Sequence, residues 1–253
     1  AVDRLMGSIQ LPLVLLRRGD ALLGLGRNVQ ANADFWAAAE SPNPPLWSIV
    51  HAVETSAELM EYDRVIGLLE RCSPIWGKAW PFRRLVANTI ERLFASRTDA
   101  CNALYAAGER EAGDALMRRT LDLIGELIER IEGLPVPLAR PKDRRVVILA
   151  EMGLAQCRHY RVDQKVAQLK AAGWTVEVYP HSDVAGFTGA LLGARIALFY
   201  RVPAFPSVLR SILVARSLGI PTIYDIDDLL FDEENFPDSI QSYEGMISPD
   251  EYI

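Results

Sequence analysis

Three aspartates, Asp225, Asp227 and Asp228, follow an apolar run in the segment IPTIYDIDDLLFDEEN (220–235). Carboxylates this close together repel one another, so a partner, solvent or a function must account for them. An Asp-x-Asp pair could supply a nucleophile and an acid–base group for phosphoryl transfer. It could also hold a divalent cation, or a carboxylate could orient a hydroxyl at the rim of an acceptor-binding site.

The phosphoryl-transfer hypothesis fails on the residues that follow. The segment YDIDDLLFD (224–232) is similar to the opening motif of haloacid-dehalogenase phosphatases, but Leu229 stands where those proteins have threonine. Only 25 residues follow Asp228, too few for the later lysine and the acids that bind magnesium. A metal site at Asp225 and Asp227 stays a minority alternative, because clustered acids are more often a solvated turn or a helix N-terminus.

A group of basic and aromatic side chains lies at or after the ends of two predicted strands: Arg158, Tyr160, Arg161 and Arg201. Arginine offers a rigid fork of donors that suits phosphate or carboxylate, and a helix that starts after a strand adds free N–H groups for an anion. Without any ligand, Arg158 or Arg161 could instead pair with Asp225 or Asp228. Two weaker candidates lie nearby, Glu151 and His159, and we expect His159 to be exposed.

After residue 143 the sequence alternates between two periods. Short apolar runs predict strands at 144–151, 174–180, 194–202 and 220–226, with helices between them at 156–173, 183–193 and 206–219. This alternation predicts a Rossmann-like α/β domain whose parallel sheet is covered on both faces. In the usual strand order 3-2-1-4, the first and fourth strands are neighbours, and ligands bind at the carboxyl ends. The arginines and the aspartates would then share one rim.

The first 132 residues predict an all-helical region, with helices ending near the prolines Pro42, Pro44, Pro45, Pro74 and Pro81. The segments LGRNVQA (25–31) and LMEYDRV (59–65) are similar at an offset of 34 residues, the period of tetratricopeptide helix pairs. The region therefore resembles an array of helical hairpins of that kind. We expect His51 on a helix face and the tryptophans in the core or between helices: Trp36, Trp47, Trp76 and Trp80.

Composition bounds the remaining possibilities. No apolar run approaches the roughly 20 residues of a membrane-spanning helix, and three widely spaced cysteines suit a reducing cytoplasm. Ten of the 33 acidic residues lie after Ser217, where there is no Lys or Arg. Nucleic-acid binding is disfavoured, because the sequence contains no basic stripe with interleaved aromatic residues. The sequence has no Gly-x-Gly-x-x-Gly after the first strand, no Walker loop and no Gly-x-Ser-x-Gly, so no cofactor is firmly indicated.

Four segments together resemble the N-terminal Rossmann-like domain of GT-B glycosyltransferases, over about the last 110 residues: CRHYRV (157–162), LFYRV (198–202), ARSLGIP (215–221) and YDIDDLLFD (224–232). The resemblance implies a parent protein that transfers a sugar from a nucleotide-sugar donor to a cell-surface glycan or related acceptor. Residues 144–253 would supply the acceptor side, joined by a linker (133–143) to the helical region (1–132). A second Rossmann-like domain beyond Ile253 would hold the donor, and the initial Ala fits a piece of a longer protein.

By this resemblance, the four basic and aromatic residues bind substrate and one of the three aspartates takes part in catalysis. The arginines would stabilise charge on the leaving diphosphate, and an aspartate would orient a hydroxyl or act as a base. A divalent metal is not expected, and no Glu-x₇-Glu pair of the donor side occurs, so the chain alone would be inactive. The expected location is the cytoplasm or the inner face of a membrane. The alternative is a scaffold whose helical array recruits a protein partner.

Overall fold

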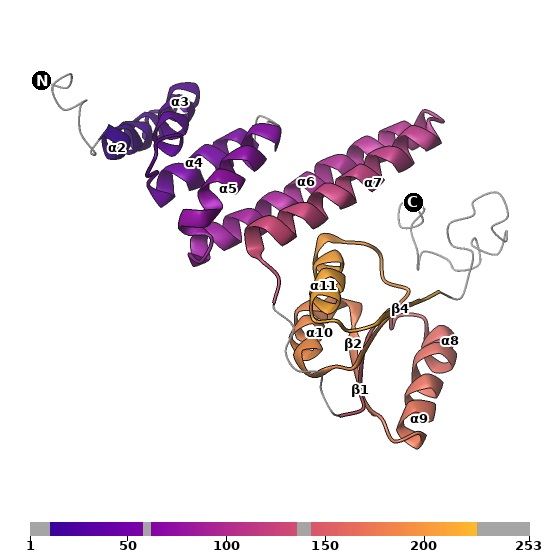
Figure 1. Cartoon of the computed structure of the whole chain (residues 1–253). Helices are drawn as coiled ribbons and strands as arrows, with labels where there is room; N and C mark the ends of the chain where they lie inside the picture. Colours follow the sequence, from indigo (N-terminus) through magenta and orange to yellow (C-terminus); the bar gives the residue numbers. More distant parts are fainter. Residues whose placement is uncertain (1–10, 58–61, 136–142, 227–253) are drawn as a thin grey trace, which may run out of the picture. The chain divides into compact units, whose positions relative to one another are not determined.

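The computed structural model describes residues 11–57, 62–135 and 143–226 (Figure 1). Helices occupy the first part up to Glu132, and a four-stranded parallel sheet with flanking helices begins at Arg145. The α/β class is therefore confirmed. The predicted linker at 133–143 lies largely outside the described residues, and the domain limits stay a prediction. No helix within the described ranges is long and apolar enough to cross a membrane.

The described part of the helical region consists of α2 (Leu11–Gly24), α3 (Asn28–Ala39), α4 (Leu46–Ala57), α5 (Tyr62–Trp76), α6 (Trp80–Ala106), α7 (Arg110–Leu127) and the π-helical turn η1 (Ile128–Glu132). Gly26, with φ 71°, and Gly108, with φ 79°, form the turns after α2 and α6, where glycine adopts left-handed backbone without strain. Pro42, Pro44 and Pro45 separate α3 from α4 as predicted. Pro74 instead lies inside the last turn of α5.

The helix starts repeat at the spacing seen in the sequence. α3 begins at Asn28 and α5 at Tyr62, and α4 begins at Leu46 and α6 at Trp80, so both pairs are offset by 34 residues. The spacing ends there, because α6 has 27 residues whereas α2 to α5 have between 12 and 15. The next helix, α7, begins at Arg110, which is more than 34 residues after the start of α5, so the repeat does not continue.

Helices α2 and α3 approach closely at Gly19. A Cβ atom on Gly19 would lie 2.5 Å from Cε1 of Phe35, a ring that is fully buried. One residue earlier on α2, Arg18 donates from Nε to Asp34 Oδ2 at 2.6 Å and from Nη2 to Asp34 Oδ1 at 2.5 Å. The small side chain and the bidentate ion pair together fix the two helices against each other.

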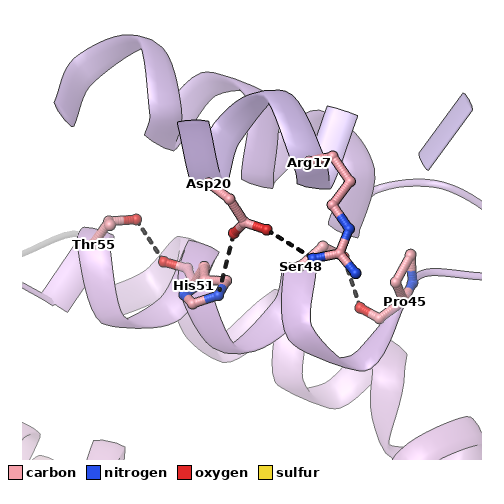
Figure 2. A network of polar contacts seen from close by, with 6 residues as sticks. All are labelled: Arg17, Asp20, Pro45, Ser48, His51 and Thr55. Atoms are coloured by element: carbon pink, nitrogen blue, oxygen red, sulfur yellow. Dashed lines mark hydrogen bonds and ion pairs between the residues drawn. The ribbon is translucent and has the colours of Figure 1, made fainter. Parts of the chain in front are cut away.

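His51 lies on a helix face, as predicted, and connects α4 to α2 (Figure 2). Its Nε2 is 3.6 Å from Asp20 Oδ1, and Asp20 also accepts a hydrogen bond of 3.3 Å from Arg17. The imidazole stacks on Phe35 with ring centroids 4.8 Å apart. His51 therefore packs between α4, α2 and α3.

The expectation for the four tryptophans is confirmed for two and wrong for two. Trp36 is 3% exposed and donates from Nε1 to Ser56 Oγ at 2.7 Å. Trp76 is half-buried and donates from Nε1 to the carbonyl of Pro44 at 3.0 Å. In contrast, Trp47 and Trp80 are 55% and 67% exposed, because each stands in the first turn of its helix, at the end of the helical layer.

The sheet has the order β2-β1-β3-β4, with every neighbouring pair parallel: β1 (Arg145–Ala150), β2 (Thr175–Pro180), β3 (Ile196–Tyr200) and β4 (Thr222–Asp225). The predicted order 3-2-1-4 is therefore wrong, since β3 and not β4 lies beside β1. The cause is the second crossover. Helix α10 (Val184–Ala190) contacts both β1 and β2, so the chain passes over β1 before it forms the next strand.

Helices lie on both faces of the sheet (Figure 1), and each face has its own apolar cluster. On one face the helix after β1 packs through Val162, Val166 and Leu169, and on the other α10 and α11 (Pro206–Ser217) cover alternate strand residues such as Val147 and Phe199. The prediction of a sheet covered on both faces holds for β1 and β3. It is wrong for β4, whose first three residues are exposed because it is the last strand at its edge of the described sheet.

At the amino end of the sheet, Arg145 and Glu177 form a bidentate ion pair, with both N–H···O distances 2.8 Å. Tyr179 donates its hydroxyl to Glu177 Oε2, also at 2.8 Å. The hydrogen bonds from Arg145 and then Tyr179 lower the pKa of Glu177 below its ordinary value, and the carboxylate in turn raises the pKa of Arg145 and of Tyr179. This cluster joins β1 to β2.

We expect Glu177→Gln to reduce stability by about 1 kcal/mol at neutral pH, since the pair is partly exposed. A carboxyl whose pKa is lowered on folding stabilises the fold above its unfolded pKa, near 4.5, and loses that contribution as the pH falls through its folded pKa. The difference between Glu177→Gln and the unchanged chain should therefore vanish at low pH. Urea unfolding at pH 7, 5, 4 and 3 measures it, and a difference that persists at pH 3 would contradict the ion-pair explanation.

Candidate functional site

The carboxyl ends of three strands lie in register at one edge of the sheet. Ala150 of β1 pairs with Tyr200 of β3, and Tyr200 pairs with Asp225 of β4. Two backbone hydrogen bonds of 3.0 Å extend these ladders, from Glu151 N to Tyr200 O and from Arg201 N to Asp225 O. The candidate site is therefore built on the ends of β1, β3 and β4, with β3 in the middle.

A continuous helix after β1 carries the predicted basic residues. Its three parts are α8 (Ala155–Cys157), the π-helical turn η2 (Arg158–Asp163) and α9 (Gln164–Ala171). Single π-helical turns inside α-helices are frequent at functional sites. Here the π turn contains three of the four predicted substrate-binding residues, Arg158, Tyr160 and Arg161.

The carboxylate of Asp225 contacts two cations of this helix. Lys165 Nζ donates a hydrogen bond to Asp225 Oδ2, and Arg161 Nη1 lies 3.8 Å from Asp225 Oδ1. The Asp225 side chain is only 19% exposed, and partial burial strengthens both attractions relative to bulk water. The structure thus brings together Arg161 and Asp225, one of the pairings that the sequence left open.

Lys165 is the residue that sequence reasoning missed. Its signal was present in the helix: Lys165 follows Arg161 by four positions, and the two flank the apolar stripe of Val162, Val166 and Leu169 that packs on the sheet. Residues at the border of a buried stripe reach the strand ends. Only arginines were considered as anion-binding residues in the sequence, and Lys165 was therefore not among the candidates.

Arg158 and Tyr160 have other surroundings. Arg158 Nε is 3.8 Å from Asp163 Oδ2 on its own helix, and both side chains are about half exposed. Tyr160 is 58% exposed, and its ring meets that of His159 edge-on at a centroid distance of 5.0 Å. His159 is exposed, as predicted.

Arg201 has an unusual backbone conformation. Its φ is 54°, and within the described ranges no other non-glycine residue has a positive φ. Left-handed backbone at such a residue costs about 1 kcal/mol or more, and this kind of strain clusters at ligand sites. Arg201 Nη1 donates to Cys157 Sγ at 3.6 Å, so β3 and the start of the helix after β1 are connected.

Tyr224 lies next to this arginine on β4. Its hydroxyl donates to the carbonyl of Val202 at 3.1 Å. Tyr224 is 55% exposed overall, but partial desolvation of its hydroxyl raises the pKa of Tyr224, and the positive charge of Arg201 opposes that rise. Tyr224 therefore stays a neutral donor at physiological pH and holds the segment after β3 against β4.

Glu151, the weaker acidic candidate, occupies the other side of the edge. Its Oε2 lies 2.7 Å from Nδ1 of His181, the residue after β2, and its Oε1 accepts a hydrogen bond from Gly153 N. A Cβ on Gly153 would lie 2.7 Å from Glu151 Oε1, so a larger residue here would require the flexible Glu151 carboxylate to shift. Glu151 and His181 thus form a second polar pair, on the ends of β1 and β2.

The other two aspartates, Asp227 and Asp228, lie outside the described residues. Within the described ranges, no group of three His, Cys, Asp or Glu side chains could hold a metal ion. At Asp225 a divalent cation would compete with the fixed charges of Lys165 and Arg161 for the same two oxygens. The donor set around Asp225 therefore fits an anion or a hydroxyl better than a metal.

Comparisons of this chain with protein-family models, with curated proteins and with solved structures found no match.

Proposed function

We propose that this chain is the acceptor-side, Rossmann-like part of a GT-B glycosyltransferase that uses a nucleotide-sugar donor, preceded by a tetratricopeptide-like helical array. The observation that carries the proposal is the meeting of Arg161 and Lys165 with Asp225 at the carboxyl edge of a parallel sheet. Open α/β sheets bind ligands at that edge. The reaction class comes from the sequence resemblance.

The cations supply the first part of the chemistry. Arg161 and Lys165 are 43% and 28% exposed, so an anionic group can reach them beside Asp225. As the sugar leaves its nucleotide, the diphosphate gains negative charge, and donors already in position stabilise that charge without reorganisation. Arg158 and Arg201 are proposed to extend this basic surface on either side.

Asp225 supplies the second part. A carboxylate has about four acceptor positions, of which Lys165 occupies one on Oδ2, while Arg161 Nη1 lies 3.8 Å from Oδ1, at ion-pair and not hydrogen-bond distance. The remaining positions can accept the hydrogen bond of an acceptor hydroxyl and direct its oxygen toward the sugar. If the reaction inverts the anomeric centre, the same carboxylate can take the proton. Asp227 and Asp228 are proposed for the same task.

The proposed partners follow from these two roles, in which the cations stabilise the diphosphate and Asp225 orients the acceptor hydroxyl. The donor would be held by a second Rossmann-like domain, and the acceptor would be a glycan, a lipid-linked sugar or a glycosylated protein. The test is a transfer assay on the complete protein, with a panel of nucleotide-sugars against glycan acceptors. We expect turnover by the complete protein and none by residues 1–253 alone. Failure of every donor to react or to be hydrolysed would overturn the proposal.

A non-catalytic scaffold is the second candidate, and the 34-residue spacing of the helix starts favours it. Stacked helical pairs offer extended surfaces for partner chains. In that case the helical region would recruit a protein, and the polar residues at the sheet edge would be structural. Loss of partner capture without loss of transfer, after changes on α3 and α5, would assign both roles to one protein.

A further inference from the structure

The helical region exposes three large apolar side chains at one end of its helical layer. Trp47, Ile75 and Trp80 are 55%, 51% and 67% exposed. Single exposed apolar residues are ordinary, but two tryptophans and an isoleucine on helix ends that meet at one junction point to a contact surface.

Hydrogen bonds bring the three positions to one junction. Trp76, at the end of α5, donates from Nε1 to the carbonyl of Pro44, which lies three residues before Trp47 on α4. Ala79 N donates to the carbonyl of Trp76 at 2.7 Å, and Trp80 follows directly as the first residue of α6. The start of α4, the end of α5 and the start of α6 therefore meet at Trp76.

Positive charge lies beside Trp80 and in the turn that precedes it. Arg83 and Arg84 lie three and four positions after Trp80 on α6, and Arg84 Cζ is 5.4 Å from the centroid of the Trp80 ring. Lys78 is exposed in the turn between α5 and α6. No acidic residue occurs from 72 to 90 or from 41 to 53 in the sequence.

Acidic side chains nearby belong to a neighbouring element. The π-helical turn η1 packs on α5, where Ser73 Oγ donates to Ile131 O at 3.3 Å, and it contains Glu129 and Glu132. Glu70 and Glu126 of the adjoining helices are both paired with Arg130. The positive charge is therefore concentrated at the start of α6 and in the turn before it.

We propose that this end of the helical region docks on an anionic lipid surface through a tryptophan–arginine patch, formed by Trp47, Ile75, Lys78, Trp80, Arg83 and Arg84. Indole rings favour the headgroup level of a bilayer, and Lys and Arg beside them reach the phosphates while their stems stay in apolar contact. Lysine beside exposed aliphatic and indole groups fits a lipid surface better than a protein interface, where lysine is depleted. This inference is independent of the proposed glycosyl transfer.

Vesicle co-sedimentation of the whole chain tests the proposal, with phosphatidylglycerol–phosphatidylcholine vesicles against pure phosphatidylcholine. We expect binding to the anionic vesicles that weakens with salt, and a blue shift of tryptophan emission. Each cation near an anionic surface contributes about five-fold in affinity, so R83E/R84E should lower binding by at least about 30-fold. Trp80→Ala should weaken it by about ten-fold.

The matched control is R118E/R119E, two exposed adjacent arginines of α7 with the same change in net charge. We expect this control to bind nearly as well as the unchanged chain. Equal binding to neutral and anionic vesicles, or an equal loss in the two charge variants, overturns the proposal. Binding to soluble polyglutamate that requires Arg83 and Arg84, without vesicle binding, would also overturn it and indicate an acidic protein partner.

Discussion

Replacing Asp225 with asparagine should lower the proposed sugar transfer by the complete protein at least about a hundred-fold, because the change removes the charge that we propose to orient the acceptor hydroxyl and to take its proton. Lys165→Ala should lower transfer by about ten-fold or more, since it frees the Asp225 carboxylate from its closest cation. Both variants should remain folded, with a stability loss of about 1 kcal/mol. Initial rates at saturating donor, alongside circular dichroism, measure these effects.

The control for charge is Lys170→Ala, in the last turn of the same helix, away from the strand ends. It should leave transfer within about two-fold of normal. Lys165→Arg keeps the positive charge and should recover part of the lost activity. One further measurement tests whether the two residues act together: the double variant of Asp225 and Lys165 should lose less activity than the two separate losses combined. Full activity of Asp225→Asn would refute the site assignment, although the protein could still be a transferase.

Gly19→Ala should destabilise the helical region by about 1–3 kcal/mol, although alanine is the better helix former. The added Cβ would lie 2.5, 2.7 and 3.0 Å from three atoms of the buried Phe35 ring. That ring also stacks on His51, so it has no free space into which to move. Thermal unfolding followed by circular dichroism measures the change.

Gly67→Ala provides the opposite case within the same region. Gly67 lies inside α5, and a Cβ there would meet nothing within 4 Å. It should therefore stabilise the protein by about 0.5–1 kcal/mol through helix propensity alone. Adding Phe35→Leu to Gly19→Ala should restore part of the loss. A stabilising Gly19→Ala would show that α2 and α3 are not held together by this contact.

The strands were predictable because their apolar runs are short and bounded by glycine or proline. β1 and β3 were both expected within two residues of their observed ends. Their order was not predictable, because the apolar pattern of a parallel strand is the same whether it lies beside β1 or two strands away. Only the packing of α10 across β1 and β2 decides it.

The candidate site was predictable in its location but not in its contacts. Arg161 and Asp225 were expected at the same rim and do form an ion pair. This part of the expectation did not depend on the strand order, because the carboxyl ends of all parallel strands lie at the same edge of the sheet. Lys165 was missed because it lies in the second half of its helix, beyond the first turn on which the expectation of an anion site was based. Arg158 was expected in the same group but pairs with Asp163.

The tryptophans show where composition misleads. A large apolar residue is usually buried, and that expectation is right for Trp36. Trp47 and Trp80 stand in the first turns of their helices, where the neighbouring helices no longer cover them. Helix periodicity predicts on which face of a helix a residue lies, but it does not predict whether the neighbouring helices extend far enough to cover that residue.

The π-helical turn from Arg158 to Asp163 has a consequence for comparing this chain with other sequences. Such a turn corresponds to one residue inserted into an α-helix. A related protein that lacks the insertion would differ by a single alignment gap, yet its helix would be rotated by about 100° on one side of the gap. Arg161 and Lys165 would then no longer point to the same aspartate. A one-residue gap here would distinguish proteins that share this arrangement from proteins that share only the sheet.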